Sequence, residues 1–507
     1  MIGGVQRRLI TVSIMMATVM QVLDMTIANV SLPHMQGNLS ATQEQISWVL
    51  TSYIVASAIM TPPIGYLAGR FGRKRFFAWT VVGFTLSSML CGAATSLEEL
   101  VIFRMLQGAF GAGLVPLSQA VLLDIYPRER HGSAMAIWGI GVMIGPIMGP
   151  TLGGYLTEYH SWRWIFYINV PFGVMASLGI LTFVPETVKD KTRPFDWFGF
   201  ILLSLGIGAL QLMLDRGQTK DWFSSTEIII EASLSGLFIY MFLVHMFTAR
   251  RPFIEPGLFR DRNLAVGLCM IFIISMILLS TITLLPPFLQ NLKGYPVITT
   301  GFVLSPRGVG TMVSMITVGI ISGRVDTRMV IMTGMILTII SLWEMTLFNL
   351  DVSTWTLVHT GFVQGLGIGL IFVPLSTIAF TTLSAHFRTE GAAMFSLMRN
   401  LGSSIGVSIM VTLLARMTQA NHSILAAHLT PFNQALSSGN WRIDSVQSLA
   451  ALNGEVTRQA AAIAYLDDFR LMMIIMLLVI PLLVLLRNPR KVWSEQDRQT
   501  AYAAAGE

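Results

Sequence analysis

Charged residues are scarce in this 507-residue chain. Asp, Glu, Lys and Arg make up only 12% of it, against about 25% in a typical soluble domain, while hydrophobic residues make up 53%. The mean hydropathy is +0.66. A soluble protein of this length would need far more polar surface. The composition therefore excludes an ordinary globular domain and indicates a membrane protein.

Cysteines and the common motifs for nucleotides and metals are also scarce. The two cysteines, Cys91 and Cys269, each lie within an apolar block, so we expect two buried thiols and no disulfide framework. The sequence contains no GxxxxGK[ST] phosphate loop and no HExxH motif. We therefore predict that the protein is not an enzyme, uses no cofactor or metal, and is not driven directly by ATP.

Apolar blocks about twenty residues long fill most of the sequence, and this length crosses the ~30 Å hydrocarbon core of a bilayer as a helix. Only helices and closed barrels satisfy the backbone there, and these blocks are too long for barrel strands. The first block continues past Asp24 without a small-residue cleavage site, so we expect a retained helix and not a signal peptide. Fourteen spans are predicted, at residues 9–31, 46–67, 76–95, 99–121, 133–156, 163–184, 197–214, 227–247, 264–288, 299–321, 329–350, 354–377, 391–415 and 468–486.

The basic residues indicate the orientation of these spans. Most of the 33 Lys and Arg residues fall in segments on the same side as the N-terminus, including the run from Arg70 to Arg75 and the end near Arg487. Positive segments stay in the cytoplasm, and an even number of spans returns the chain to its starting side. We expect both termini to be cytoplasmic. This distribution also explains the net charge of +6 without a nucleic-acid partner.

The two halves of the chain repeat each other. "GYLAGRFGRKR" at 65–75 corresponds to "GIISGRVDTRM" at 319–329, and "QGAFGAGLVPLS" at 107–118 corresponds to "QGLGIGLIFVPLS" at 364–376. Such spacing predicts parallel repeats of six spans with an inserted pair between them. The predicted domains are an N-terminal bundle at 1–186, the inserted helix pair at 187–258, and a C-terminal bundle at 259–507 with a long external segment at 416–467.

These motifs resemble those of the major facilitator superfamily. The loop at 65–75 and "RMLQGAFGAG" at 104–113 are similar to two signatures of that superfamily. "GIGVMIGPIMGPTLGG" at 139–154 is similar to the fifth-helix motif of drug:proton antiporters, and "LDMTIANVSLP" and "WRWIFYINVPFG" resemble motifs of the fourteen-span antiporters. Within that family the chain resembles the EmrB-like multidrug exporters of Gram-negative inner membranes.

The resemblance implies a major facilitator fold of two six-helix bundles plus two inserted helices. It also implies export of hydrophobic or amphipathic toxic compounds in exchange for protons by alternating access. The segment at 416–467 would then meet a periplasmic adaptor (membrane-fusion) protein that leads to an outer-membrane channel. Two alternatives remain open: export of a physiological metabolite or fatty acid by the same fold, and a sensor or scaffold that transports nothing.

Asp24 and Arg104 are the first candidates for proton coupling. At 1.5 Å of rise per residue, both lie roughly 8–9 Å below the outer boundary, on helices that line the central cavity in this superfamily. An ion pair that forms and breaks changes the proton affinity of its carboxyl group, which antiport requires. The alternative is a permanent salt bridge that ties the first and fourth spans together.

Three glutamines are candidates for substrate contacts. Gln21 shares a helix face with Asp24, and Gln107 lies one turn from Arg104. Gln364 is the counterpart of Gln107 in the second repeat. The alternative role for Gln107 and Gln364 is hydrogen bonding between helices.

Two motifs are candidates for the moving parts of the carrier. The access-switching motif consists of Gly145, Pro146, Gly149, Pro150, Gly153 and Gly154, where small residues permit close helix contact and prolines kink the span. The cytoplasmic gate comprises Gly65, Arg70, Gly72 and Arg73. The superfamily usually has an acid at position 69, where this chain has glycine; the latch between the halves is then either absent or moved to Asp124 or Asp326. Packing and topology are the alternative roles for the two motifs.

Four further ionisable residues lie within the predicted spans. Glu344 and His359 are secondary candidates for proton transfer, although a structural role is expected for Glu344 and a solvated or hydrogen-bonded role for His359. Arg307 and Arg399 either attract an anionic substrate or pair with backbone carbonyls beside Pro and Gly irregularities. We favour the structural role for both arginines.

Overall fold

The computed structural model describes residues 4–127, 130–187, 189, 194–250, 252–321, 324–384, 387–429 and 445–487. Every regular element in these ranges is a helix. Twelve helices or continuous helix pairs are long and apolar enough to cross a membrane, and the bent pair α2–α3 gives a thirteenth span. The remaining predicted span, 133–156, lies in α7, of which 131–145 is counted as a shorter apolar helix. The predicted fold class of an all-α, multi-pass membrane protein is confirmed.

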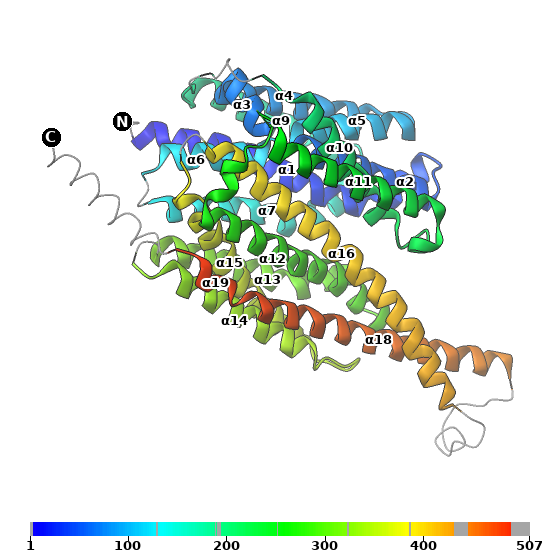
Figure 1. Cartoon of the computed structure of the whole chain (residues 1–507). Coiled ribbons are helices and arrows are strands. Elements are labelled where there is room, and N and C mark those ends of the chain that lie inside the picture. The colour runs from blue at the N-terminus through cyan, green and yellow to red at the C-terminus, as the bar shows by residue number, and fades with distance from the viewer. Residues whose placement is uncertain are drawn as a thin grey trace, which may run out of the picture.

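The first half of the chain runs from α1 to α9. Its helices are α1 (Gly4–Asn38), α2 (Gln43–Met60), α3 (Ile64–Phe71), α4 (Arg73–Ala93), α5 (Leu97–Gly111), α6 (Leu114–Ile125), α7 (His131–Tyr159), α8 (Trp164–Tyr167) and α9 (Asn169–Phe183). Each predicted span from 9–31 to 163–184 falls on one of these helices or on two in succession. Figure 1 shows them gathered on one side of the molecule, in blue and cyan.

Two helices follow before the second half begins. They are α10 (Trp197–Arg216) and α11 (Thr226–Thr248), which pack against each other and fall within the predicted insertion at 187–258. The second half contains α12 (Arg262–Pro287), α13 (Val297–Ile321), α14 (Thr327–Met345), α15 (Thr354–Thr381), α16 (Arg388–Ala427), α18 (Val446–Val479) and α19 (Leu482–Leu485). Short elements η2 (Trp222–Ser224), η3 (Pro256–Arg260) and η4 (Phe288–Leu292) connect them.

Local sequence explains where the helices begin and break. Ser96, Asp261 and Ser353 begin α5, α12 and α15, and each side chain accepts a hydrogen bond from a backbone N–H of the first turn. The prolines that follow Thr61 separate α2 from α3, which meet at a 60° bend. A proline ring cannot donate to the helical ladder and crowds the preceding turn, so this span is broken in two.

The two halves meet at the face where α1 and α12 begin, which we call the terminal face. Here α7 packs against α13 and α15, and α16 packs against α3 and α6. The end of the described chain lies at the same face, because Arg487 N donates to Asn263 Oδ1 of α12 at 2.7 Å. In Figure 1 the two groups of helices come together at this face and separate toward the opposite one.

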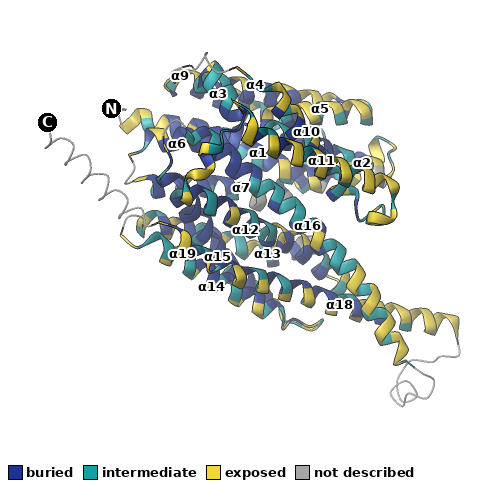
Figure 2. Ribbon diagram, viewed as in Figure 1, coloured by how far each residue is buried: buried dark blue, intermediate teal, exposed yellow. Residues whose placement is uncertain are grey.

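Burial follows this arrangement. In Figure 2 buried residues concentrate inside each half and between the halves, whereas α11 is mostly exposed. Cys91 is buried, as expected, but the prediction that Cys269 is buried was wrong, because that thiol is exposed on α12. An apolar block in a membrane protein supplies both inward and outward faces, so hydrophobicity alone does not give the direction of one side chain.

The segment predicted to be external forms two long helices. α16 continues to Ala427 without a break, and α18 begins at Val446, before the apolar stretch of its span. His422 Nε2 and Asn453 Oδ1 are joined across the two helices at 3.0 Å. Figure 1 shows both helices projecting beyond the rest of the molecule, on the side away from the terminal face. We call this projection, residues 416–427 and 446–467, the helical hairpin; Pro431 and Gly439, which interrupt the sequence between its arms, lie outside the described residues.

Candidate functional site: a buried carboxylate held by four helices

Asp24 lies at the centre of a polar cluster inside the first half. Its side chain and that of Arg104 are each about 1% exposed, and Arg104 Nη1 donates to Asp24 Oδ2 at 2.7 Å. The other carboxylate oxygen, Oδ1, accepts from Gln107 Nε2 at 2.9 Å and from Asn169 Nδ2 at 2.8 Å. Both oxygens of the carboxylate are therefore satisfied within the protein, as a buried charge requires.

Arg104 has further partners besides Asp24. Its Nη1 also donates to Gln107 Oε1 at 2.7 Å, and its Nε donates to the carbonyl oxygen of Val49 on α2 at 3.1 Å. The guanidinium carbon lies 4.3 Å from the centre of the Tyr53 ring, at cation–π distance. If Asp24 lost its charge, the guanidinium would still keep two hydrogen-bond acceptors and an aromatic face.

Asn169 and Ser88 complete the cluster and were not among the predicted site residues. Asn169 Nδ2 donates to Ser88 Oγ at 3.0 Å, and Ser88 Oγ donates to the carbonyl oxygen of Phe166 at 2.8 Å. The sequence feature that could have identified Asn169 is its position in "WRWIFYINVPFG", where it is a polar residue at the start of an apolar helix. We call Asp24, Ser88, Arg104, Gln107 and Asn169 the Asp24 cluster; its side chains come from α1, α4, α5 and α9.

Glycines allow the helices around the cluster to approach closely. A Cβ at Gly108, between Gln107 and the end of α5, would overlap the carbonyl oxygen of Tyr53 on α2. No residue larger than glycine fits there without moving a backbone. The short distance between α2 and α5 is what lets Arg104 reach the Val49 carbonyl.

The access-switching motif lies along α7 and packs against the helix that carries Asp24. Added Cβ atoms at Gly145 and Gly153 would lie 2.5 Å from Val22 Cγ1 and 2.8 Å from Ile27 Cγ1 on α1. Gly149 faces Thr26 of α1 in the same row, and the Thr26 hydroxyl donates to the Gly145 carbonyl at 3.0 Å. The motif therefore holds α7 against α1 on either side of Asp24.

Gly154, the last glycine of the motif, makes no such contact. A Cβ at Gly154 would meet nothing within 4 Å. The side chains of Pro146 and Pro150 lie outside the described residues, although α7 continues through both positions without a break. Among the described residues of the motif, the contacts with α1 are made by three glycines spaced four residues apart.

The candidate glutamines differ in their surroundings. Gln107 belongs to the Asp24 cluster and has little freedom to bind a substrate. Gln21 and Gln364 are 6% and 1% exposed, and the Oε1 atom of each has no hydrogen-bond partner in the described part of the chain. A buried acceptor without a donor costs free energy, so these two amides differ from Gln107, whose Oε1 accepts from Arg104 Nη1.

The predicted gate lies at the terminal face. Asp124, at the end of α6, pairs with Arg73 of α4 in its own half and with Arg388 of α16, whose Nη1 lies 2.8 Å from Asp124 Oδ1. A Cβ at Gly65 would lie 2.9 Å from Glu390 Cα on α16, and Gly72 has a φ of 90°, which favours glycine. Of the two positions considered for a relocated latch, the structure brings Asp124 into contact with the other half.

Asp326 and Arg70 lie at helix ends. Asp326 begins α14, and its Oδ1 accepts from the backbone N–H of Arg328 at 3.0 Å, which is a helix cap. Arg70 lies in the last turn of α3, where a cation interacts favourably with the helix dipole. A Cβ at Gly69, where the superfamily has an acid, would meet nothing within 4 Å.

The four remaining candidates all lie outside the Asp24 cluster, in the second half. Glu344 and His359 pair with each other at the end of α14 and in α15, with 3.4 Å between Oε2 and Nδ1. Arg307 Nη2 donates to the carbonyl oxygen of Leu278 at 3.2 Å, which agrees with the structural role favoured from the sequence. Neither Arg307 nor Arg399 has an acidic residue at ion-pair distance within the described ranges.

Comparisons with known proteins agree with this architecture. A model of the Major Facilitator Superfamily matches residues 14–407. The chain is 36% identical over 470 residues to the multidrug export protein EmrB of Haemophilus influenzae, covering 91% of this chain and 92% of that protein. It is 34% identical over 487 residues to the fatty acid resistance protein FarB of Neisseria gonorrhoeae, covering 95% and 96%.

Among solved structures, the human organic anion transporter MFSD10 superposes with a TM-score of 0.59 at 14% identity, covering 93% of this chain and 99% of that one. At this identity the likeness concerns the fold alone. The family model and the relatives extend over most of the chain, and the helical architecture is the one their family shares. The chain is therefore a multi-pass membrane transporter, not an enzyme, and belongs to the Major Facilitator Superfamily.

Proposed function

We propose that this protein exports hydrophobic and amphipathic toxic compounds in exchange for protons. The observation that carries the proposal is the buried Asp24–Arg104 pair, in which the guanidinium has other partners to hold it when the carboxylate is neutral. The relatives named as a multidrug exporter and a fatty acid resistance protein support export as the direction of transport.

The proposed cycle begins with Asp24 ionised and paired with Arg104. A proton that enters from outside neutralises Asp24, and the neutral acid releases Arg104 to Gln107 and the Val49 carbonyl. Substrate leaves, the halves rock to the inward-facing state, and the proton departs to the cytoplasm. Alternating access about a central site is the mechanism expected of repeats of this kind.

The proposed orientation places the terminal face in the cytoplasm of a bacterial inner membrane. The basic gate residues Arg73 and Arg388 lie at this face, as positive-inside topology requires. In this proposed orientation, the contacts that join the halves there, including the Asp124–Arg388 pair, would hold the cytoplasmic side closed.

A specific observation keeps anionic amphiphiles, such as fatty acids, as a second substrate class. Arg307 and Arg399 lie within the second half, and neither is neutralised by an acid in the described residues. The relative named as a fatty acid resistance protein is consistent with this class. Uptake assays with a cationic dye, a neutral uncoupler and a fatty acid, in the wild type and Arg307→Gln, would separate the two classes.

The test of proton coupling is uptake into inverted membrane vesicles driven by an imposed pH gradient. The variant is Asp24→Asn, and the matched control is Asp468→Asn, because Asp468 on α18 is also a buried carboxylate but lies in the other half. We expect Asp24→Asn to bind substrate yet lose pH-driven accumulation, while Asp468→Asn retains it. Size-exclusion profiles in detergent verify that both variants are folded.

Accumulation that survives in Asp24→Asn would show that Asp24 is only a structural partner of Arg104. If Asp468→Asn alone abolished accumulation, the proton carrier would lie on α18, and the proposed mechanism would be wrong in its central residue.

The helical hairpin is proposed as the contact for a periplasmic adaptor protein that leads to an outer-membrane channel. The arms of 416–427 and 446–467 extend roughly 18 Å and 33 Å at the rise of an α-helix. Apolar side chains on them are exposed, among them Ile424 at 58% and Leu449 at 45%. Photo-crosslinkers at Ile424 and Leu449 are expected to capture the adaptor, and one at Tyr240 on α11, 66% exposed, is expected not to. Equal capture from all three positions would contradict the proposal.

A further inference from the structure

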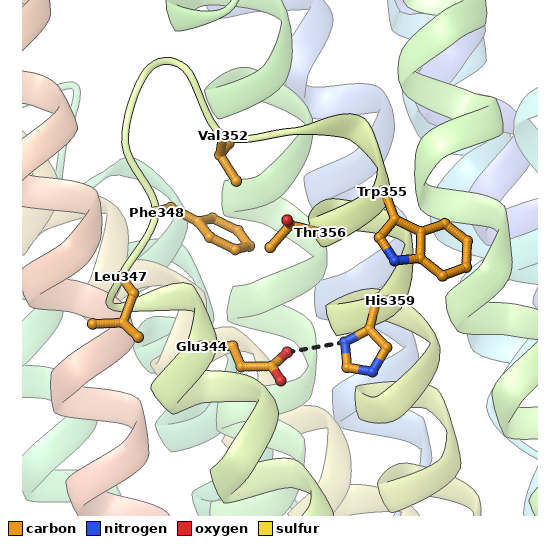
Figure 3. A pocket seen from close by; sticks show the side chains of 7 residues that line it. All are labelled: Glu344, Leu347, Phe348, Val352, Trp355, Thr356 and His359. Atoms are coloured by element: carbon orange, nitrogen blue, oxygen red, sulfur yellow. Dashed lines mark ion pairs between the residues drawn. The ribbon is translucent and has the colours of Figure 1, made fainter.

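A second charged site lies at the far end of the other half, beneath the loop that joins α14 to α15. Here a cavity of about 390 Å³ opens to the surface. Seven residues line it: Glu344, Leu347, Phe348, Val352, Trp355, Thr356 and His359. We call it the Glu344 pocket, and Figure 3 shows it from close by. The pocket shares no residue with the Asp24 cluster, so its role does not depend on the proposed function.

The base of the pocket is a carboxylate with one oxygen left open. Glu344 Oε2 accepts from Thr360 Oγ1 at 2.8 Å and lies 3.4 Å from His359 Nδ1, the contact dashed in Figure 3. Oε1 receives no hydrogen bond from the described residues, and the Glu344 side chain is 23% exposed. One acceptor oxygen is therefore fixed in orientation, and the other remains available to a ligand.

The walls are apolar and held in place from behind. Phe348 is 4% exposed and packs against Phe288 and Phe469, with ring centres 6.1 Å and 6.4 Å away. Lys293 Nζ donates to the carbonyl oxygens of Leu350 and Val352, at 3.0 Å and 2.6 Å, which fixes the loop above.

Figure 3 shows how the lining is arranged. The side chains of Phe348, Val352 and Thr356 point into the space above Glu344, and the indole of Trp355 lies at its side. The Trp355 residue is 74% exposed, so an aromatic face is open at the rim. The pocket thus combines one carboxylate with apolar and aromatic walls.

We propose that the Glu344 pocket binds the ammonium group of an amphiphile. An organic cation gains from the open carboxylate oxygen and from aromatic faces, whose negative quadrupole attracts positive charge. An anion would be repelled by Glu344, and a cavity of this size accepts a substituted ammonium group with part of its apolar body.

Ethidium binding to the purified protein in detergent, measured by fluorescence, tests this. Glu344→Gln keeps the shape of the side chain and removes its charge, and we expect it to weaken ethidium binding roughly fivefold or more. Asp351→Asn, on the same loop but outside the lining, is the matched control and is expected to leave binding unchanged.

A neutral dye measured in parallel separates a charge effect from collapse of the pocket. If Glu344→Gln weakened the neutral dye as much as ethidium, or left ethidium unchanged, the proposal would be overturned. The same ethidium measurements in the Asp24→Asn background keep the two sites distinct. If Glu344→Gln still weakens ethidium binding in that background, the effect belongs to the Glu344 pocket. If the effect disappears, ethidium was bound at the central site and the proposal is overturned.

Two sources supply an amphiphilic ammonium group, namely a lipid headgroup and a transported cation. Nanodiscs with and without phosphatidylethanolamine, all containing phosphatidylglycerol, distinguish them. If phosphatidylethanolamine competes with ethidium, and this competition requires Glu344, the result supports the site and assigns it to a lipid headgroup. Slower ethidium export in Glu344→Gln without lipid competition supports the site and assigns it to substrate. If neither is seen, the pocket is not an ammonium site of this protein.

Discussion

The two halves of this transporter are built alike but carry different chemistry. In the first half, Asp24 lies on α1 between Val22 and Thr26, the residues that face Gly145 and Gly149 of α7. In the second half, α16 packs Gly402 and Gly406 against Phe272 and Met276 of α12 in the same manner: a Cβ added at these glycines would lie 2.8 Å from the Phe272 carbonyl carbon and 2.6 Å from Met276 Cα. The residue between these two contacts is Ile274, which is 3% exposed. A buried acid in one half thus corresponds to a buried aliphatic side chain in the other.

The same contrast holds for the partners of Asp24. The repeat that relates Gln107 to Gln364 also relates Arg104 to Gly361. Gln107 binds Asp24, whereas Gln364 Oε1 has no partner in the described chain. The packing is similar in both halves, but at this position the described residues of the second half hold no counterpart of the Asp24–Arg104 pair. The same helix packing can therefore serve a repeat with a buried ion pair and a repeat without one.

The largest effect expected from this difference concerns two arginines. Arg104→Leu leaves Asp24 buried without its countercharge, which costs about 3–5 kcal/mol of folding stability. Arg307→Leu removes a cation that has no acidic partner in the described residues, so we expect no loss of stability. Thermal unfolding in detergent, followed by tryptophan fluorescence, measures both variants. Equal losses would show that the halves do not differ electrostatically.

The second prediction concerns the feature that the halves share. Gly145→Ala and Gly402→Ala each place a Cβ against the backbone of the partner helix, within 2.7 Å of Val22 C and 2.8 Å of Phe272 C. Overpacking of this kind costs roughly 1–3 kcal/mol, and we expect similar values in the two halves. Gly154→Ala is the control, because its Cβ would meet nothing within 4 Å. A large loss in the first half alone, seen in the same thermal assay, would mean that the packing is not equivalent.

The smallest effect is expected where the halves meet. Arg388→Gln removes the contact of the second half with Asp124, in a partly exposed pair worth about 1 kcal/mol or less. We expect the terminal face to open more often, with longer distances between spin labels at Phe71 and Val325. Arg75→Gln breaks a pair with Glu186 within the first half and is the control. Identical distance distributions for the two variants would exclude Asp124 as a latch.

Sequence patterns predicted the fold and the pair at its centre. Apolar block length gave the spans, and helix rise placed Asp24 and Arg104 at the same depth, where the structure joins them. The participation of Asn169 and Ser88 was not predicted, because it depends on how α4 and α9 turn relative to α1. Depth along a helix can be counted from a sequence, but rotation about its axis is set by packing against neighbours.

The gate shows the same limit. The glycine at position 69 indicated that the usual latch is absent, and Asp124 and Asp326 remained as equal alternatives. The structure shows one such contact, because Asp124 ends α6 beside α16 and pairs with Arg388 there. Which acid reaches the opposite half depends on the docking of the two halves, and no local pattern contains that information.

The position of α7 has a mechanical consequence. One end lies on the helix of Asp24 through Gly149, and the other touches the opposite half, where Ser133 Oγ donates to the Gly319 carbonyl at 3.0 Å. These points are roughly 24 Å apart at the rise of an α-helix. A tilt of about 5° at Gly149 would displace Ser133 by about 2 Å, the size of helix shift that accompanies switching in other proteins. Such a displacement would break this hydrogen bond, so we propose that α7 acts as a lever that converts a small change beside one carboxylate into separation of the two halves.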